Sequence, residues 1–205
     1  MKTKFFKTEA FKCIAVLFVI TVAMCTILAV LNDVLYVSSE ERLNRAVKKV
    51  YGKSVTAQAQ EIDENRVAKD FGSIEEYYSF TDEGVYYELF KSTGIKGYKD
   101  GTVTLWVLVK YENDKPVSIA NVTIDSYEKQ TLMSSFTFSF FKTYTSITTE
   151  ELESGKLFKT GNSKYDNAML NNTDIKNVVS GATMSSNAMN NAVNTVLLYL
   201  WGEAV

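Results

Sequence analysis

One uninterrupted apolar run, from Cys13 to Asn32, constrains this chain more than any other feature of its sequence. The run has about 20 residues and no charge, and this is the length that an α-helix needs to cross the hydrocarbon core of a bilayer. Apolar residues continue it to Tyr36, past any small-residue site at which a secretory signal would be cleaved. The pattern predicts a retained transmembrane helix at 13–36, and a cleaved signal peptide is the alternative.

The charges on either side of this run indicate its orientation. Four lysines and one glutamate precede it, so residues 1–12 are expected to stay in the cytoplasm. The whole chain has 22 basic and 24 acidic residues, so the part after the run is the more acidic one. Residues 37–205 are therefore predicted to form one extracytoplasmic domain at the cell membrane. A basic cluster soon after the run weakens this asymmetry: Arg42, Arg45, Lys48 and Lys49.

Composition excludes several classes of function. The chain contains no histidine, which removes the Ser/His/Asp and Cys/His catalytic arrangements. Cys13 and Cys25 both lie in the apolar run, which leaves no thiolate for a metal site or a disulfide in the domain. The formal net charge of −2 provides no basic footprint for nucleic acid. We therefore expect no catalytic side chain and no metal site.

The periodicity of the domain predicts an α+β fold with an antiparallel sheet and flanking helices. Aromatic and β-branched runs separated by turn residues predict strands, and helical spacing of apolar residues predicts a helix at each end. The predicted helices are 40–51 and 185–201, and the predicted strands are 77–81, 85–93, 102–109 and 117–124. Residues 131–144 fit either a helix packed on the sheet or an extended loop. The polar stretch 160–176 is expected to be a surface loop.

The motif with the most chemical content is Ser180-Gly181-Ala182-Thr183, directly before the last predicted helix. Its small residues allow a turn that delivers the Thr183 hydroxyl to the start of that helix. The first N–H groups of a helix lack intrahelical partners and carry the positive end of the macrodipole, so a phosphate group is stabilised there. The same four residues also fit an ordinary helix N-cap, which needs no cofactor.

This motif, followed by Ser186-Asn187-Ala188 and a closing apolar helix in a chain with one N-terminal span, resembles the FMN-binding family. Within that family the closest resemblance is to the G-type subunit of the Rnf electron transport complex. A C-type subunit of the sodium-pumping NADH:quinone reductase is related to it. The resemblance implies that a flavin transferase esterifies the phosphate of FMN to Thr183. The rest of the attachment motif would be Ser180, Gly181 and Ala182.

The resemblance also implies a place for the flavin ring. The ring-side loop of the family corresponds to residues 128–133, which keep only the Glu and the Leu of the family's pattern. We expect the isoalloxazine near Glu128, Thr131 and Leu132, and an exposed strand end without a ligand is the alternative. A second departure is Asn177, because the family usually has an aspartate there.

By this resemblance, the chain is expected to be a non-autonomous electron-transfer subunit of an Rnf-type ion-translocating ferredoxin:NAD oxidoreductase. Its cofactor would be covalent FMN, which carries the redox chemistry while the protein positions it. Its partners would be the integral membrane and redox subunits of that complex, the flavin transferase and the membrane. Two alternatives stay open: a free-standing extracellular flavoprotein electron carrier, and a cofactor-free anchored binding module in which Thr183 only caps the helix.

Overall fold

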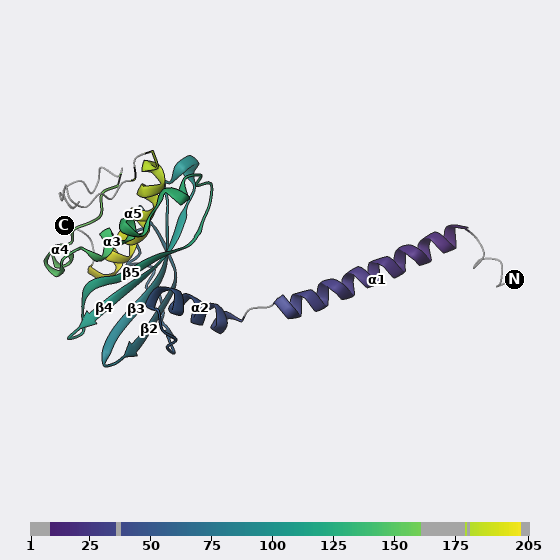
Figure 1. Ribbon diagram of the computed structural model, residues 1–205, viewed down its shortest axis with the longest axis horizontal. Helices are drawn as coiled ribbons and strands as arrows, with labels where there is room; N and C mark the ends of the chain where they lie inside the picture. Colours follow the sequence, from purple (N-terminus) through teal and green to yellow (C-terminus); the bar gives the residue numbers. More distant parts are fainter. Residues whose placement is uncertain (1–8, 36–37, 161–178, 180, 202–205) are drawn as a thin grey trace. The chain divides into compact units, whose positions relative to one another are not determined.

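The computed structural model of the chain describes residues 9–35, 38–160, 179 and 181–201 (Figure 1). They divide after Arg42 into two compact units. The first unit contains α1, Glu9–Leu35, in which Phe11–Asn32 is long and apolar enough to cross a membrane. Apolar side chains are exposed all round this helix, for example Leu17 and Phe18, as in a helix that is solvated by lipid. The helix predicted from the apolar run is confirmed.

The second unit is built on a five-stranded antiparallel sheet in the order β1-β2-β3-β4-β5 (Figure 1). Its strands are β1 Gln58–Ala59, β2 Gly72–Asp82, β3 Val85–Gly94, β4 Val103–Glu112 and β5 Lys115–Tyr127. Its helices are α2 Ser39–Tyr51, whose first four residues belong to the first unit, α3 Phe138–Thr145, α4 Thr149–Glu153 and α5 Thr183–Trp201, with short 3₁₀ turns η2 Tyr98–Asp100 and η3 Met133–Ser135. The predicted α+β fold is confirmed.

Local turn chemistry sets the register of the two long hairpins. The β2–β3 turn consists of Glu83 (φ 51°) and Gly84 (φ 80°), and the β4–β5 turn of Asn113 (φ 51°) and Asp114 (φ 61°). Two central residues with positive φ are the mark of the two-residue turns whose twist matches antiparallel strands. The strands extend further than predicted. For example, β2 begins at Gly72, whereas the predicted strand begins at residue 77.

The segment whose structure was left open, 131–144, contains both a short 3₁₀ turn and a helix. η3 buries Met133, and α3 then packs beside β5 with Phe140 and Tyr144 buried. The predicted surface loop at 160–176 lies outside the described residues apart from Thr160.

Two hydrophobic clusters cover the two faces of the sheet. α5 supplies the larger cluster with Ala188, Ala192 and Val196, which are fully buried beside Phe90 and Val107. α2 contributes Ala46, Val47 and Val50 to the smaller cluster, where they are buried with the strand residues Trp106 and Leu108. Neighbouring residues of a strand point to opposite faces, so Trp106 and Val107 serve different clusters.

Three buried asparagines of α5 were not anticipated, because the sequence pattern singles out only the apolar residues of this helix. The Asn194 side chain accepts from the N–H of Phe158 at 2.8 Å and donates to the Phe158 carbonyl at 2.8 Å. Asn190 donates to the Lys159 carbonyl at 2.7 Å, and Asn191 donates to the Ile95 carbonyl at 2.7 Å. These amides supply the partners that buried backbone groups of irregular segments need.

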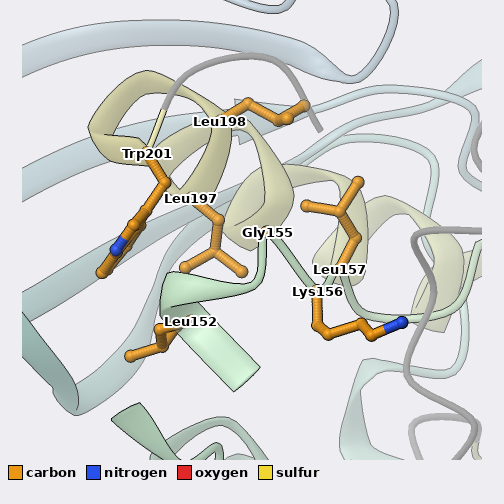
Figure 2. Close-up of a pocket in the computed structure, with 7 residues that line it drawn as sticks. All are labelled: Leu152, Gly155, Lys156, Leu157, Leu197, Leu198 and Trp201. Atoms are coloured by element: carbon orange, nitrogen blue, oxygen red, sulfur yellow. The ribbon is translucent and has the colours of Figure 1, made fainter. Parts of the chain in front are cut away.

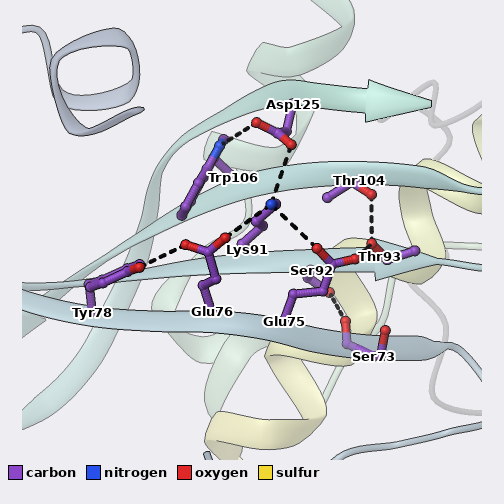
Figure 3. A network of polar contacts seen from close by, with 10 residues as sticks. All are labelled: Ser73, Glu75, Glu76, Tyr78, Lys91, Ser92, Thr93, Thr104, Trp106 and Asp125. Carbon is purple, nitrogen blue, oxygen red and sulfur yellow. Dashed lines mark hydrogen bonds and ion pairs between the residues drawn. The ribbon is translucent and has the colours of Figure 1, made fainter. Parts of the chain in front are cut away.

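Polar side chains also bind one another across the strands. Figure 3 shows Lys91 among three carboxylates, with Nζ–O distances of 3.0 Å to Glu76, 3.4 Å to Glu75 and 3.7 Å to Asp125. The Trp106 indole N–H donates to Asp125 at 2.9 Å and so holds that carboxylate in place. Burial opposes the charge of Lys91, but its hydrogen bond to Glu76 and the nearby carboxylate charges outweigh burial and raise the pKa of Lys91.

A second polar cluster surrounds the buried carboxylate of Glu88, which is 6% exposed. The hydroxyl of Tyr77 donates to it at 2.5 Å, and the hydroxyls of Tyr111 and Tyr86 also donate to it. Burial, followed by the hydrogen bond to Glu88, raises the pKa of Tyr77 and of Tyr111 well above the ordinary value of 10. Burial and a hydrogen bond to Glu76 raise the pKa of Tyr78 to about 12.

These shifts predict an alkaline limit to stability. A tyrosine whose pKa is raised by folding holds its proton more tightly in the folded state, so it stabilises the fold fully below a pH of about 10. This stabilisation is lost as the pH rises through the folded-state pKa. In an absorbance titration near 295 nm, we expect exposed tyrosines to ionise near their ordinary pKa and Tyr77 and Tyr111 to ionise only with unfolding. Titration of all 12 tyrosines in one step near pH 10 would contradict this arrangement.

Candidate functional site

A tight turn directly precedes α5. The N–H of Ala182 donates to the Val179 carbonyl at 2.9 Å, and Gly181, at the third position of this turn, has a φ of +82°. Only glycine adopts such a φ without strain. The Ser186 hydroxyl accepts from the N–H of Val179 at 3.0 Å and donates to the Ala182 carbonyl at 3.1 Å, so the helix itself holds the turn.

Thr183 is the first residue of α5, and its side chain is exposed. The first intrahelical bond runs from the N–H of Ser186 to the carbonyl of Ala182 at 2.9 Å, which makes Ala182 the N-cap residue. Thr183 therefore does not occupy the cap position that the cofactor-free interpretation assigned to it. Among the described residues its hydroxyl has no hydrogen-bond partner, so it is open to an external group.

The side chain of Gln130 joins three segments around this helix end. Its Oε1 accepts from the Ser185 hydroxyl at 2.7 Å and from the N–H of Tyr98 at 3.1 Å. Its Nε2 donates to the Glu128 carbonyl at 2.9 Å and to the Tyr98 carbonyl at 3.4 Å. Gln130 is 7% exposed, so these contacts replace water. The first turn of α5, the 3₁₀ turn at Tyr98 and the loop after β5 are thereby fastened together.

Two glycines make this junction possible. A Cβ atom at Gly97 would lie 2.6 Å from Nε2 of Gln130 and 3.1 Å from the Cβ of Ala188 on α5. A Cβ atom at Gly101 would lie 2.2 Å from the Glu128 carbonyl oxygen and 2.5 Å from Nε2 of Gln130. Real Cβ atoms do not approach other atoms so closely, so both positions require glycine.

The structure brings the two predicted halves of the site together. Glu128, Thr131 and Leu132 are all exposed on the loop that Gln130 fastens to Ser185. Gly181 is exposed in the turn, and Ala182 is buried at 4% exposure. Ser180 and Asn177 lie outside the described residues.

Large apolar side chains are exposed around the same junction. Tyr98 is 40% exposed, Leu132 43% and Met184 46%. The backbone of Tyr98 is bonded to the Gln130 side chain. Leu132 lies two residues after Gln130, and Met184 directly precedes Ser185. They present an apolar surface beside a helix N-terminus, which is the combination that a flavin with its phosphate needs.

The junction combines strained backbone with a small excess of positive charge. Lys96 (φ 63°), Lys99 (φ 51°) and Lys129 (φ 56°) are exposed lysines in left-handed conformations, and the acidic side chains beside them are Asp100 and Glu128. The other described non-glycine residues with positive φ outside this junction lie in the two hairpin turns. Strained backbone away from hairpins concentrates at functional sites.

A comparison with family models decides the cofactor class. Residues 97–198 match the FMN-binding domain family. The match covers about half of the chain, begins at Gly97 of the junction and includes Gln130, Thr183 and nearly all of α5. Neither the comparison with curated proteins nor that with solved structures finds a match.

Sequence reasoning missed four residues of the junction: Gly97, Gly101, Gln130 and Ser185. The pair Gly97 and Gly101, four residues apart between two predicted strands, is the only local signal that could have indicated a close contact there. Gln130 carries no such signal, because its main partner Ser185 is 55 residues away.

A small apolar pocket between α4 and α5 is separate from this junction (Figure 2). Its lining residues are Leu152, Gly155, Lys156, Leu157, Leu197, Leu198 and Trp201. Leu197 lies 14 residues after Thr183 on the same helix, which corresponds to roughly 20 Å at about 1.5 Å per residue. The pocket therefore does not belong to the junction around Gln130.

We predict that Gln130→Leu loosens the junction. Leucine keeps much of the volume but leaves Tyr98 N–H and the Ser185 hydroxyl buried without a partner, at a cost of about 1–3 kcal/mol for each such group. Gln60→Leu is the control, because the Gln60 side chain forms one hydrogen bond, to Ser79 at 2.9 Å, near β1. Urea denaturation should show a loss of about 3 kcal/mol for Gln130→Leu and under about 1 kcal/mol for Gln60→Leu. Equal losses would mean that Gln130 does not organise the junction.

Proposed function

We propose that this protein is a membrane-anchored electron carrier that holds FMN through a phosphoester to Thr183. The observation that carries the proposal is the exposed Thr183 side chain at the first position of α5, inside a segment that matches the FMN-binding domain. Attachment forms a bond between the threonine Oγ and the flavin-side phosphorus of a flavin dinucleotide, breaks the phosphoanhydride bond of that donor, and releases a nucleoside monophosphate and the hydroxyl proton. A flavin transferase catalyses this transfer.

The junction supplies what the attached group requires. The N–H groups at the start of α5 and the lysines of the turns stabilise the remaining phosphate charge. The loop with Glu128, Thr131 and Leu132 forms the surface for the isoalloxazine ring. The bound flavin supplies the electron-transfer chemistry, and the described residues position it and contribute no histidine or thiol of their own at the junction.

The proposal extends to the complex in which the carrier works. α1 anchors the chain with residues 1–12 in the cytoplasm and the FMN-binding domain on the extracytoplasmic face. The carrier belongs to an Rnf-type ion-translocating ferredoxin:NAD oxidoreductase and passes electrons between the other components of that complex. A non-autonomous carrier of this kind needs no substrate site of its own, because its redox partners supply and remove the electrons.

The test is flavin fluorescence of the denatured full chain after expression with a flavin transferase. Fluorescence that stays with the unfolded polypeptide in a gel, and a peptide with the mass of FMN on Thr183, would support covalent attachment. Flavin that is lost on denaturation would refute the ester but keep the FMN-binding domain. Copurification from native membranes then distinguishes a member of a complex, which retains its partners, from a free-standing carrier, which does not.

The turn before α5 should matter for attachment more than for stability. Gly181→Ala puts an alanine at a φ of +82° with no atom within 4 Å of the new Cβ, so it costs only backbone strain of about 1–2 kcal/mol. Gly84→Ala, at a φ of +80° and equally open, is the matched control in the β2–β3 hairpin. We expect equal losses of stability, and a lower fraction of covalent flavin for Gly181→Ala alone. Equal flavin content in both variants would show that the transferase does not require this turn.

A further inference from the structure

α2 has one buried face and one charged face. Ala46, Val47 and Val50 are buried against the sheet, so the orientation of the helix about its own axis is determined by packing. The exposed residues of the helix are mainly basic, Arg42, Arg45, Lys48 and Lys49, with Glu40 and Glu41 in the first turn. Lys49 also reaches the carboxy-terminal part of β5, where its Nζ donates to the Ile124 carbonyl at 2.7 Å. The sheet thus holds the basic face outward as a rigid surface.

This concentration of positive charge is unlike the rest of the domain. α2 has four basic and two acidic residues, whereas residues 52–205 have 14 basic and 20 acidic side chains. An otherwise acidic domain therefore presents one basic face, which selects a negatively charged partner.

The covalent chain places this face near a membrane surface. The apolar stretch of α1 ends at Asn32 and α2 begins at Ser39, so six residues separate them. The seven Cα–Cα steps from Asn32 to Ser39 span at most about 25 Å when fully extended, whatever the arrangement of the two units. A tether this short keeps the basic face at a high effective concentration beside the lipid headgroups of the bilayer that α1 crosses.

We propose that the basic face of α2 binds the anionic phospholipid headgroups of that bilayer. The lysines and arginines attract the surface charge, and the acidic remainder of the domain is repelled by it, so the contact orients the domain on the membrane. This function is independent of the flavin and does not rest on the identity of the redox partner.

The test uses the full chain reconstituted in vesicles, with Cys13 and Cys25 replaced by serine and a nitroxide spin label on Asn44→Cys. Asn44 is exposed on α2 between the basic residues. In vesicles with about one third anionic phospholipid, we expect the label to be at least about twofold less accessible to a water-soluble nickel chelate than in neutral vesicles. Salt at about 0.5 M should remove the difference, because it screens exposed charges.

Charge variants identify the surface responsible. Arg42→Glu with Lys48→Glu should abolish the twofold difference between lipids, and the neutral pair Arg42→Gln with Lys48→Gln should reduce it. Lys69→Glu with Lys115→Glu makes the same change of charge at exposed positions outside α2 and should leave the difference intact. The proposal would be overturned if the label on the chain with an unchanged basic face were equally accessible in anionic and neutral vesicles. It would also be overturned if the two charge-reversed pairs, in α2 and outside it, had the same effect.

Discussion

Thr183→Val is expected to abolish covalent flavin while the domain stays folded. Valine has the shape of threonine but no hydroxyl, so no phosphoester can form at this position. The side chain is exposed and has no hydrogen bond to another described residue, so the free energy of unfolding should change by less than about 0.5 kcal/mol. In-gel fluorescence of the denatured chain measures the first effect, and urea denaturation in detergent measures the second.

Two further variants make this result specific. Thr149→Val removes a threonine that is also the first residue of a helix, α4, and whose hydroxyl donates to the Val117 carbonyl at 3.0 Å. It should keep the full amount of covalent flavin. Thr183→Ser keeps a hydroxyl and should keep part of the covalent flavin. Fluorescence that survives in Thr183→Val would place the ester on another residue.

Gly94→Ala is expected to destabilise the fold strongly, because α5 lies directly on the end of β3. A Cβ atom there would be 1.9 Å from the Ala188 carbonyl oxygen and 2.4 Å from the N of Ala192. Both atoms belong to the helix backbone, so no side chain can rotate away and α5 must move. We expect a loss of about 3 kcal/mol, the upper range for overpacking a core, together with less covalent flavin because the junction at Gly97 moves with the helix.

The comparison variant is Gly52→Ala, which follows α2. Its φ is +89° and no atom lies within 4 Å of the added Cβ, so it suffers backbone strain without a collision. A loss of about 1 kcal/mol is expected there, measured by the same urea denaturation of the full chain. If both variants lose the same amount, the close contact between β3 and α5 is not a determinant of stability.

Signals that act over a few residues were read correctly from the sequence. The uncharged run predicted α1, the helical spacing of apolar residues predicted α2 and α5, and the turn residues between the predicted strands predicted the two hairpins. A helix, a strand or a two-residue turn is decided mainly by its own residues and their immediate neighbours. The resemblance to the FMN-binding family rested on such a local motif, and the family match at 97–198 agrees with it.

Contacts between distant segments could not be read in this way. Nothing near Gln130 in the sequence indicates that it bonds Ser185, and nothing near Glu88 indicates that three tyrosines from β2, β3 and β4 meet it. The partners of the buried side-chain amides of α5 could not be read from the sequence either. Burying these amides would destabilise the fold if the backbone at Ile95 and Phe158 did not form hydrogen bonds with them.

The sequence by itself determined the apolar helix, the α+β class, the hairpins and the position of the Thr183 hydroxyl at the start of a helix. Only the tertiary structure decided that the loop at 128–132 lies against that helix start, that Ala182 rather than Thr183 is the cap, and that α2 turns its basic face outward. The physical reason is that secondary structure follows from local periodicity, whereas the pairing of segments depends on which apolar faces and buried polar groups satisfy one another across the whole domain.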